Sequence, residues 1–288
     1  MSPADTPRNP VSNVILHTRP IPSTGEEIPI IGLGTWRVFD VGRKADERKP
    51  LEQCVAYLAA EGRSVIDSSP MYGRAEDVVG EVVETLAVRE RLFIATKVWT
   101  TGEERGVEQM RASLRKLRVD HVDLMQVHNL VDTGTHLETL RRWKGEGLTR
   151  YVGVTHYAAR SHADVARVLQ REPVDFVQIN YSVDEREAER TVLPIAADRG
   201  IAVIVNRPFA NGGTLTRLRR TPLPPFAAAL ECTSWAQLLL KFVVSHAAVT
   251  CAIPATANPA HLRDNVTAGS GPLPDAATRH EIARAARS

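Results

Sequence analysis

The chain has 288 residues, with 36 lysines and arginines against 34 aspartates and glutamates, and a formal net charge of +2. This near balance gives no case for a nucleic-acid or membrane partner, and no segment reaches the roughly 18 apolar residues of a membrane helix. Cys54, Cys232 and Cys251 lack C-x-x-C spacing, which argues against a disulfide framework and a thiolate metal site. We therefore expect a cytoplasmic protein, with the polar residues 1–13 as a disordered leader.

Short runs rich in β-branched residues recur along the chain, and stretches with helical spacing lie between them. The eight runs span residues 28–34, 64–69, 92–98, 121–128, 150–155, 174–180, 201–206 and 249–254. Strands that alternate with helices indicate repeated βα units and a parallel sheet. Eight units predict a closed (β/α)8 TIM barrel of the α/β class, formed by residues 14–288 as a single domain.

An open, doubly wound sheet is the alternative, because periodicity alone does not reveal whether a sheet closes. Such a sheet normally carries a G-x-G-x-x-G motif after its first strand. Here Gly32 and Gly34 are followed by Arg37 at the third glycine position, so the motif fails. The barrel is therefore the favoured fold.

Two segments fall outside the βα repeat. Residues 14–31 contain two short extended arms around a turn at residues 23–25, which predicts a hairpin that closes the bottom of the barrel. Residues 211–232 carry paired glycines and three prolines between the seventh strand and its helix. Long loops of this kind are either lids and binding segments or mobile surface loops, and the sequence favours neither.

Polar residues stand at or just after the ends of three consecutive strands. The second strand ends at Asp67, with Tyr72 close behind it, the third ends at Lys97, and the fourth ends at His128. Each has an ordinary explanation on its own, as a helix cap, a solvated charge or a core histidine. Together they converge on the C-terminal rim of a barrel, where barrel active sites lie.

These four residues have the chemistry to deliver a proton to an oxygen that gains negative charge. A tyrosine hydroxyl titrates near about 10, so it needs a group that stabilises its phenolate. Lys97 supplies a positive charge for that purpose, and Asp67 keeps the lysine charged and oriented. A neutral His128 donates a hydrogen bond to the substrate oxygen.

A metal site is the competing interpretation, since His121, Asp123, His128, Asp132 and His136 crowd together in the sequence. At about 3.3 Å per residue, His121 and His128 stand about 23 Å apart at opposite ends of one strand. Their side chains also have opposite parity along that strand. We therefore expect no metal.

The motifs together resemble the aldo-keto reductase family of NAD(P)H-dependent barrel oxidoreductases. The resemblance runs from Arg19 to Asn265 and rests on GLGTW at 32–36, Asp67 with SSPMYGRAEDVVG at 68–80, TK at 96–97, VDLMQVHN at 122–129, GVTHY at 153–157, VQINY at 177–181 and IPATANPAHLRDN at 253–265. It implies that Tyr72 is the general acid, supported by Asp67, Lys97 and His128, while a nicotinamide donates hydride to a carbonyl carbon. It also implies a monomer.

The resemblance further implies a set of cofactor-binding positions. They are Gly34, Thr35, Trp36, Asp67, Thr155, His156, Gln178, Asn206, Arg207, Pro208, Phe209, Thr256, Arg263, Asp264 and Asn265. Thr155 and His156 replace a Ser-Asn pair of the family and keep hydrogen-bonding atoms for the nicotinamide carboxamide. Asn206 replaces an aromatic residue that stacks on the nicotinamide in the family. We expect Arg207 or Phe209 to take over part of this stacking role, and Arg207 to lie near the pyrophosphate.

The segment after the last strand bears on the choice between NADPH and NADH. Ala255, Thr256 and His261 stand where the family has the Lys, Ser and Arg that hold the 2′-phosphate of NADPH. Arg263, with His261 and the start of the last helix, is still able to receive a phosphate. The expected cofactor is NADPH, with NADH as the alternative.

The expected substrate is an aldehyde or ketone of small to medium size, walled by Trp36, Tyr72, Trp99 and His128. The short tail after Asn265 lacks an aromatic segment to grip the substrate, which leaves the site open.

Two other functions stay open. One is a catalytically weak NADP(H)-binding regulatory protein on the same fold, and the other is a lyase or isomerase that works without nicotinamide. The set of Asp67, Tyr72, Lys97 and His128 favours carbonyl reduction, because a pure binding protein has no need of a proton-delivery network.

Overall fold

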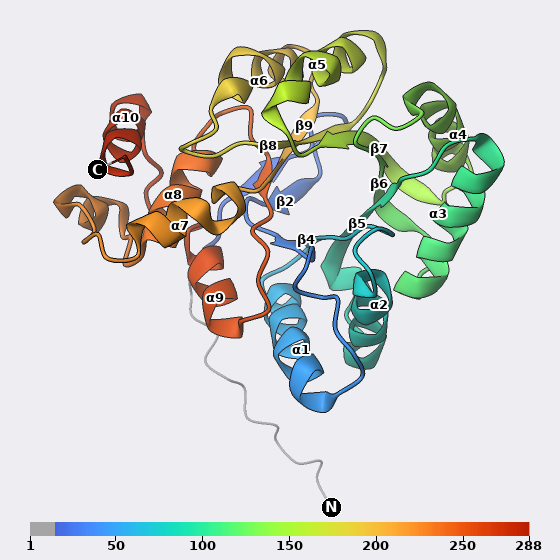
Figure 1. The fold of residues 1–288 in the computed structure, drawn as a ribbon, viewed down its shortest axis with the longest axis horizontal. Helices are drawn as coiled ribbons and strands as arrows, with labels where there is room; N and C mark the ends of the chain where they lie inside the picture. The colour runs from blue at the N-terminus through green and yellow to red at the C-terminus, as the bar shows by residue number, and fades with distance from the viewer. Residues whose placement is uncertain (1–14, 288) are drawn as a thin grey trace, which may run out of the picture.

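The computed structural model describes residues 15–287, and the expected leader over residues 1–13 lies outside this range. Eight parallel strands form one sheet in the middle of the molecule (Figure 1). In sheet order they are β10 (Cys251–Ala252), β9 (Ala202–Asn206), β8 (Phe176–Asn180), β7 (Thr149–His156), β6 (Val122–His128), β5 (Leu92–Val98), β4 (Ser64–Asp67) and β3 (Leu33–Gly34). The order follows the chain, as expected for repeated βα units.

The sheet closes into a barrel where its first and last strands meet. Parallel bridges join Ile31 to Ala252 and Gly34 to Ala255 across this seam. Gly34 allows the close approach, because a Cβ atom at this position would stand 2.9 Å from the carbonyl oxygen of Ile253. The predicted (β/α)8 barrel is therefore confirmed, and the terminal strands β3 and β10 are only two residues long each.

Helices surround the strands (Figure 1). They are α1 (Ala45–Ala60), α2 (Ala75–Leu86), α3 (Glu103–Leu117), α4 (Thr133–Gly145), α5 (His162–Arg171), α6 (Val192–Asp198), α7 (Gly213–Leu218), α8 (Trp235–Val244), α9 (Pro259–Thr267) and α10 (Ala276–Ala285). Apolar residues at helical spacing, such as Leu51, Val55 and Leu58 of α1, are fully buried against the barrel. Every helix within residues 15–287 is too short or too polar to span a membrane.

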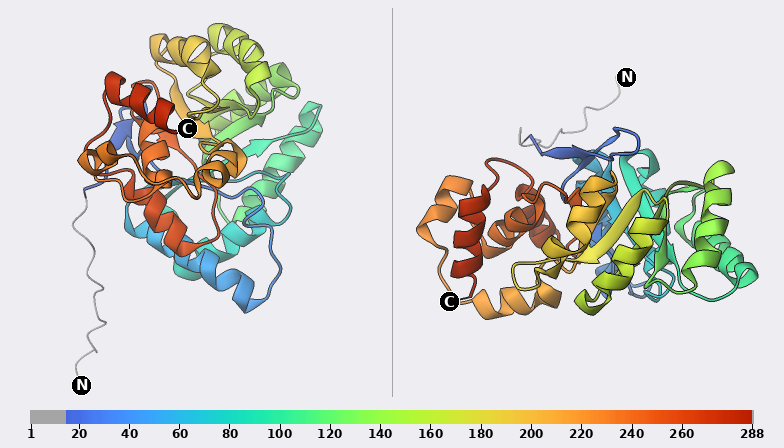
Figure 2. Two further views of the ribbon diagram at one scale, coloured as in Figure 1. Left: turned by 60° about the vertical axis from the view of Figure 1, so that its left-hand side comes forward. Right: turned by 90° about the horizontal axis from the view of Figure 1, so that it is seen from above.

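The expected hairpin precedes the barrel and consists of β1 (Thr18–Pro20) and β2 (Glu27–Pro29), which pair antiparallel. Figure 2 shows it across one end of the barrel, on the side opposite α7. Ile21 and Ile28 of this segment pack in one buried cluster with Phe93, Leu124 and Phe176 from inside the barrel. The hairpin thus closes the end at which the strands begin.

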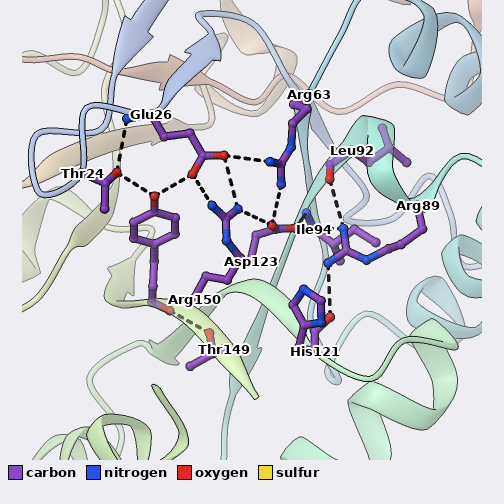
Figure 3. A network of polar contacts seen from close by, with 11 residues as sticks. Thr24, Glu26, Arg63, Arg89, Leu92, Ile94, His121, Asp123, Thr149 and Arg150 are labelled. Carbon is purple, nitrogen blue, oxygen red and sulfur yellow. Dashed lines mark hydrogen bonds and ion pairs between the residues drawn. The ribbon is translucent and has the colours of Figure 1, made fainter. Parts of the chain in front are cut away.

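An ion-pair network holds the hairpin in place (Figure 3). The fully buried carboxylate of Asp123 lies 3.1 Å from Arg63, 3.1 Å from Arg89 and 2.7 Å from Arg150. Glu26 of the hairpin also pairs with Arg63, at 3.1 Å, and with Arg150. Asp123, part of the histidine-aspartate cluster in the sequence, is thus a structural anchor at the bottom of the barrel.

Residues 211–232 form ordered helical turns rather than an irregular loop. They contain α7 and a 3-10 helix at Pro225–Leu230. The ammonium of the buried Lys241 donates hydrogen bonds to the carbonyl oxygens of Leu230 at 2.7 Å, Ser270 at 2.7 Å and Pro272 at 2.9 Å. This lysine ties the end of the segment to the chain before α10.

Candidate active site

A cavity of about 860 Å³ opens at the end of the barrel where the strands finish. The sequence-predicted site residues on its wall are Gly34, Thr35, Trp36, Asp67, Tyr72, His128, Thr155, Gln178, Asn206, Arg207, Pro208, Phe209, Thr256, Asp264 and Asn265. Lys97, Trp99, His156 and Arg263 do not line it. The α7 segment and the start of α8 and α9 complete the wall.

A buried ion pair lies beneath the cavity floor. Lys97, at the end of β5, is fully buried, and its Nζ lies 2.6 Å from Asp67 Oδ2 and 2.6 Å from the carbonyl oxygen of Ser68. Burial lowers the pKa of Lys97, but the carboxylate of Asp67 and the phenol of Tyr72 outweigh it, and the net pKa is raised. Lys97 is therefore a charged ammonium held at two points.

Tyr72 faces this ammonium from the loop after β4. The Lys97 Nζ lies 5.1 Å from the centroid of the Tyr72 ring. Burial raises the pKa of the Tyr72 hydroxyl, the charge of Lys97 opposes that rise, and Asp67 adds to it. Lys97 lowers the pKa of Tyr72, as inferred from the sequence, but the effect of burial is larger and the net pKa is raised. The phenol therefore carries its proton at neutral pH.

His128, at the end of β6, is the second polar ring beside the cavity. Its ring centroid lies 6.0 Å from that of Tyr72 at an interplanar angle of 84°. Burial, with the charges of Lys97 and His156, lowers the pKa of His128 to about 2, so the ring is neutral. The Ser69 Oγ lies 3.1 Å from Nδ1. When Ser69 donates this bond, the imidazole proton resides on Nε2 and is available to a ligand.

Amide side chains orient Asp67 from the other side. Its Oδ1 accepts hydrogen bonds from Gln178 at 2.9 Å and from Gln126 at 3.2 Å. Gln178 in turn accepts from Thr155 at 3.3 Å and from Asn206 at 3.4 Å. Ser69 and Gln126 are site residues that the sequence did not predict. Gln126 has the same strand parity as His128, which is the signal for a side chain that points into the barrel.

Two predicted cofactor residues point elsewhere. Thr155 faces into the barrel, so the next residue on β7, His156, faces out, and its Nδ1 accepts a hydrogen bond from the Ala158 amide at 3.1 Å. Arg263 of α9 places its guanidinium 6.0 Å from the Tyr57 ring.

The cavity wall carries arginines that have no carboxylate partner in the part of the chain that the structure describes. Arg37, Arg207 and Arg219 line the cavity, and none of them pairs with a carboxylate within residues 15–287. The one other wall carboxylate besides Asp67, that of Asp264, accepts hydrogen bonds from Ser234 and Gln237, both at 2.7 Å. The charge pattern is complementary to an anionic ligand.

Backbone strain concentrates around the same cavity. Arg37, Asn129 and Arg207 have left-handed φ angles of 63°, 55° and 52° in the loops after β3, β6 and β9. Non-glycine residues adopt this conformation at a cost and tend to do so at functional sites. Four further wall residues have no predicted role, because loop conformation decides whether they reach the cavity: Arg37, Asn129, Tyr157 and Arg219.

The arrangement combines a protonated phenol, a buried cation beside it, a neutral imidazole and a cationic cavity. Such a set can donate a proton to a ligand oxygen and stabilise the charge that remains on the donor. Within residues 15–287, no three His, Cys, Asp or Glu side chains gather closely enough to hold a metal ion.

Known proteins share both sequence and fold with this chain. A family model described as "Aldo/keto reductase family" matches residues 30–280. Methylglyoxal reductase YeaE of Escherichia coli is 30% identical over 248 residues, which cover 83% of this chain and 84% of the relative. An NADH-specific methylglyoxal reductase of Escherichia coli is 28% identical over 233 residues, which cover 69% of this chain and 70% of the relative.

A solved structure of an aldo/keto reductase from Klebsiella pneumoniae, in complex with NADP and acetate, has a TM-score of 0.76 and 26% identity. The similarity covers 90% of this chain and 92% of that chain. The range matched by the family model includes every residue that lines the cavity.

Proposed function

Because the chain belongs to the aldo/keto reductase family, we propose that it reduces an aldehyde or ketone to an alcohol with NADPH, and that Tyr72 is the general acid. The observation that carries the proposal is the convergence of Asp67, Lys97, Tyr72 and His128 beside one cavity. When bound, the reduced nicotinamide supplies the hydride. The chain supplies binding, orientation and the proton.

The residues present fit a dinucleotide. The cavity lies within the size range of small-molecule sites. Its three arginines, which have no carboxylate partner among the described residues, suit phosphate groups. Asn206 Oδ1 and Arg207 Nε are buried without a hydrogen-bond partner among the described residues, as expected of atoms placed for a ligand. Thr155, Gln178 and Asn206 hold the nicotinamide end in this proposal.

The remaining wall residues are assigned to the rest of the dinucleotide. Arg37, Arg207 and Arg219 meet the phosphates, and Thr256, Asp264 and Asn265 meet the adenosine end. The cationic wall and the similarity to a structure solved with NADP favour NADPH. The NADH-specific relative keeps NADH as the alternative.

Proton transfer follows from the geometry of the three polar groups. The neutral His128 donates its Nε2 proton to the carbonyl oxygen and fixes the orientation of the carbonyl group. Tyr72 then gives its hydroxyl proton to this oxygen as negative charge develops on it. The ammonium of Lys97 stabilises the phenolate that remains, and Asp67 keeps the ammonium charged and aimed.

The substrate is a carbonyl compound of small to medium size. Trp36 and Tyr72 border the cavity, and Trp99 stands with its ring centroid 6.3 Å from that of His128. Methylglyoxal is the first compound to test, because two relatives are named for its reduction. We further propose a monomeric, single-domain, cytoplasmic enzyme.

The test is a titration of the purified protein with NADPH and, separately, with NADH, followed by tryptophan fluorescence. Methylglyoxal or 4-nitrobenzaldehyde is then added while the absorbance of the reduced cofactor is monitored. Selective binding of NADPH and aldehyde-dependent oxidation are the expected results. Tight binding without turnover of any carbonyl would instead favour the regulatory alternative, and the absence of binding would contradict both.

A further inference from the structure

Trp99 presents an apolar face next to the proposed proton donors. It follows β5 directly and is 42% exposed, and its ring centroid lies 6.3 Å from that of His128. Trp36 and Met71, which line the cavity, are exposed to a similar degree. Exposed apolar side chains gathered at one rim indicate a surface that receives a ligand.

A side chain of α3 holds the backbone of Trp99 from both ends. The Oε1 atom of Gln109 accepts a hydrogen bond from the Trp99 amide at 2.5 Å, and Gln109 Nε2 donates to the Trp99 carbonyl oxygen at 3.2 Å. One amide side chain thus satisfies both polar groups of one backbone residue. This fixes the direction in which the indole leaves the chain.

Helix α4 holds the residues that follow. His136, fully buried, lies with its Nε2 2.7 Å from the carbonyl oxygen of Thr100. Asp132 accepts a hydrogen bond from the Gly102 amide at 2.7 Å. A Cβ atom at Gly106 would stand 2.5 Å from the His136 ring, so α3 approaches this histidine as closely as glycine allows. The loop of residues 99–102 is therefore immobilised by two helices.

We infer that Gln109 is a positioning residue for substrate recognition. By fixing the backbone of Trp99, it holds the indole as a flat wall beside His128, and this wall selects carbonyl compounds that carry a flat apolar group. A compound as small as methylglyoxal does not extend to this wall. The kinetic consequence of this inference rests on the proposed reductase function. The hydrogen bonds by which Gln109 holds the Trp99 backbone do not depend on that function.

The kinetic test compares Gln109→Ala with the control Glu108→Ala, an exposed neighbour on α3 whose carboxylate makes no hydrogen bond or ion pair with the residues that the structure describes. Gln109→Ala is expected to raise the KM for 4-nitrobenzaldehyde about five- to tenfold, the worth of one aromatic contact, with kcat and the KM for methylglyoxal unchanged. Gln109→Glu keeps the acceptor for the Trp99 amide and should recover part of the effect.

A double-mutant cycle separates positioning from general damage. In a Trp99→Ala background, Gln109→Ala should leave the KM for 4-nitrobenzaldehyde unchanged, because the wall is already gone. Additive effects of the two substitutions would overturn the inference. So would an equal rise of KM for both aldehydes in Gln109→Ala alone.

Amide hydrogen exchange tests the clamp without any turnover. Exchange of the Trp99 amide should accelerate about tenfold or more in Gln109→Ala, and not in Glu108→Ala. Unchanged exchange overturns the inference whether or not the protein reduces aldehydes. If the wild-type protein binds NADPH but reduces neither aldehyde, the proposed function is contradicted. If the Trp99 amide of that inactive protein still exchanges faster in Gln109→Ala, the clamp is upheld.

Discussion

The ammonium of Lys97 lies 2.6 Å from the carboxylate of Asp67 and 5.1 Å from the centre of the Tyr72 ring. One buried cation therefore faces a carboxylate that keeps it charged and a phenol whose ionised form it stabilises. In the proposed reaction the phenol loses its proton, and the cation is already in position at that moment. Preorganised charge of this kind lowers the energy of the transition state without reorganisation of solvent.

Replacing the cation should separate catalysis from binding. Lys97→Met is expected to lower kcat for aldehyde reduction by about 10²–10⁴-fold, because the phenolate loses its stabilising charge. It should also lower the free energy of unfolding by about 3–5 kcal/mol, since Asp67 is left buried without its partner. Steady-state kinetics and urea unfolding measure the two effects. The exposed Lys49, replaced by Met, is the control, and an unchanged kcat in Lys97→Met would contradict the assigned role.

The pH dependence of reduction should be simple. The proton donor must be protonated, and burial raises the pKa of Tyr72 above its usual value of 10.0. We therefore expect kcat to stay constant through neutral pH and to fall only as pH rises through this elevated pKa. His128 contributes no inflection near neutral pH, because its pKa is lowered to about 2. A kcat profile with an inflection near pH 6.5 that disappears in His128→Gln would disagree with a neutral His128.

Burial of a neutral histidine also predicts acid sensitivity of the fold. The pKa of His128 is about 2 in the folded protein against 6.5 for an unperturbed histidine. The unfolded chain therefore binds the additional proton first, and stability that is present above about pH 6.5 is lost as pH falls below it. His128→Gln should show a shallower loss of unfolding free energy between about pH 6 and 4, by up to about 1.4 kcal/mol per pH unit. Parallel urea curves of the two proteins measure the difference.

Two arginines provide a matched test of the cofactor site. Arg207 lines the cavity without an ion pair among the described residues, whereas the guanidinium of Arg263 lies over the Tyr57 ring. Arg207→Met should raise the Kd for NADPH about tenfold, the worth of one charge-assisted contact, and Arg263→Met should change it little. Fluorescence titration gives both constants. A larger rise of the Kd in Arg263→Met than in Arg207→Met would mean that the cofactor does not bind along the part of the cavity wall that carries Arg207.

The bottom of the barrel should govern stability and leave catalysis unchanged. Asp123 is fully buried among Arg63, Arg89 and Arg150 at the end of the barrel that the hairpin closes (Figure 3). Asp123→Ala is expected to cost about 3–5 kcal/mol of unfolding free energy with kcat retained in the folded fraction. Arg63 is 41% exposed, so Arg63→Met should cost about 1 kcal/mol or less. Equal losses in the two variants would contradict this account of the network.

Periodicity predicted the barrel and the hairpin because both depend on which residues are buried. The βα alternation, the turn before Glu27 and the inward parity of Gln178 are all local features of the sequence. The position of His156 also follows from strand parity, since Thr155 and His156 on one strand face opposite sides. The family resemblance assigned Thr155 and His156 together to the nicotinamide carboxamide, and so it did not reveal that the two side chains point in opposite directions.

Other parts of the site depend on long-range packing and could not be predicted. Arg37 and Asn129 reach the cavity wall through left-handed loop conformations that carry no glycine signal. Gln109 contacts Trp99 across a loop and a helical turn, which no spacing rule anticipates. Residues 211–232 contain α7 and a further helical turn, and the hydrogen bond from the distant Lys241 to the carbonyl oxygen of Leu230 is not visible in the local sequence.

The central claim is that Tyr72 donates the proton, and Tyr72→Phe tests it most directly. The substitution removes one oxygen atom and keeps the ring beside Lys97 and His128. The account predicts that kcat/KM for aldehyde reduction falls by about 10²-fold or more, while the Kd for NADPH stays within about twofold of the wild-type value. Turnover at the wild-type rate with the cofactor bound as before would show that another group delivers the proton.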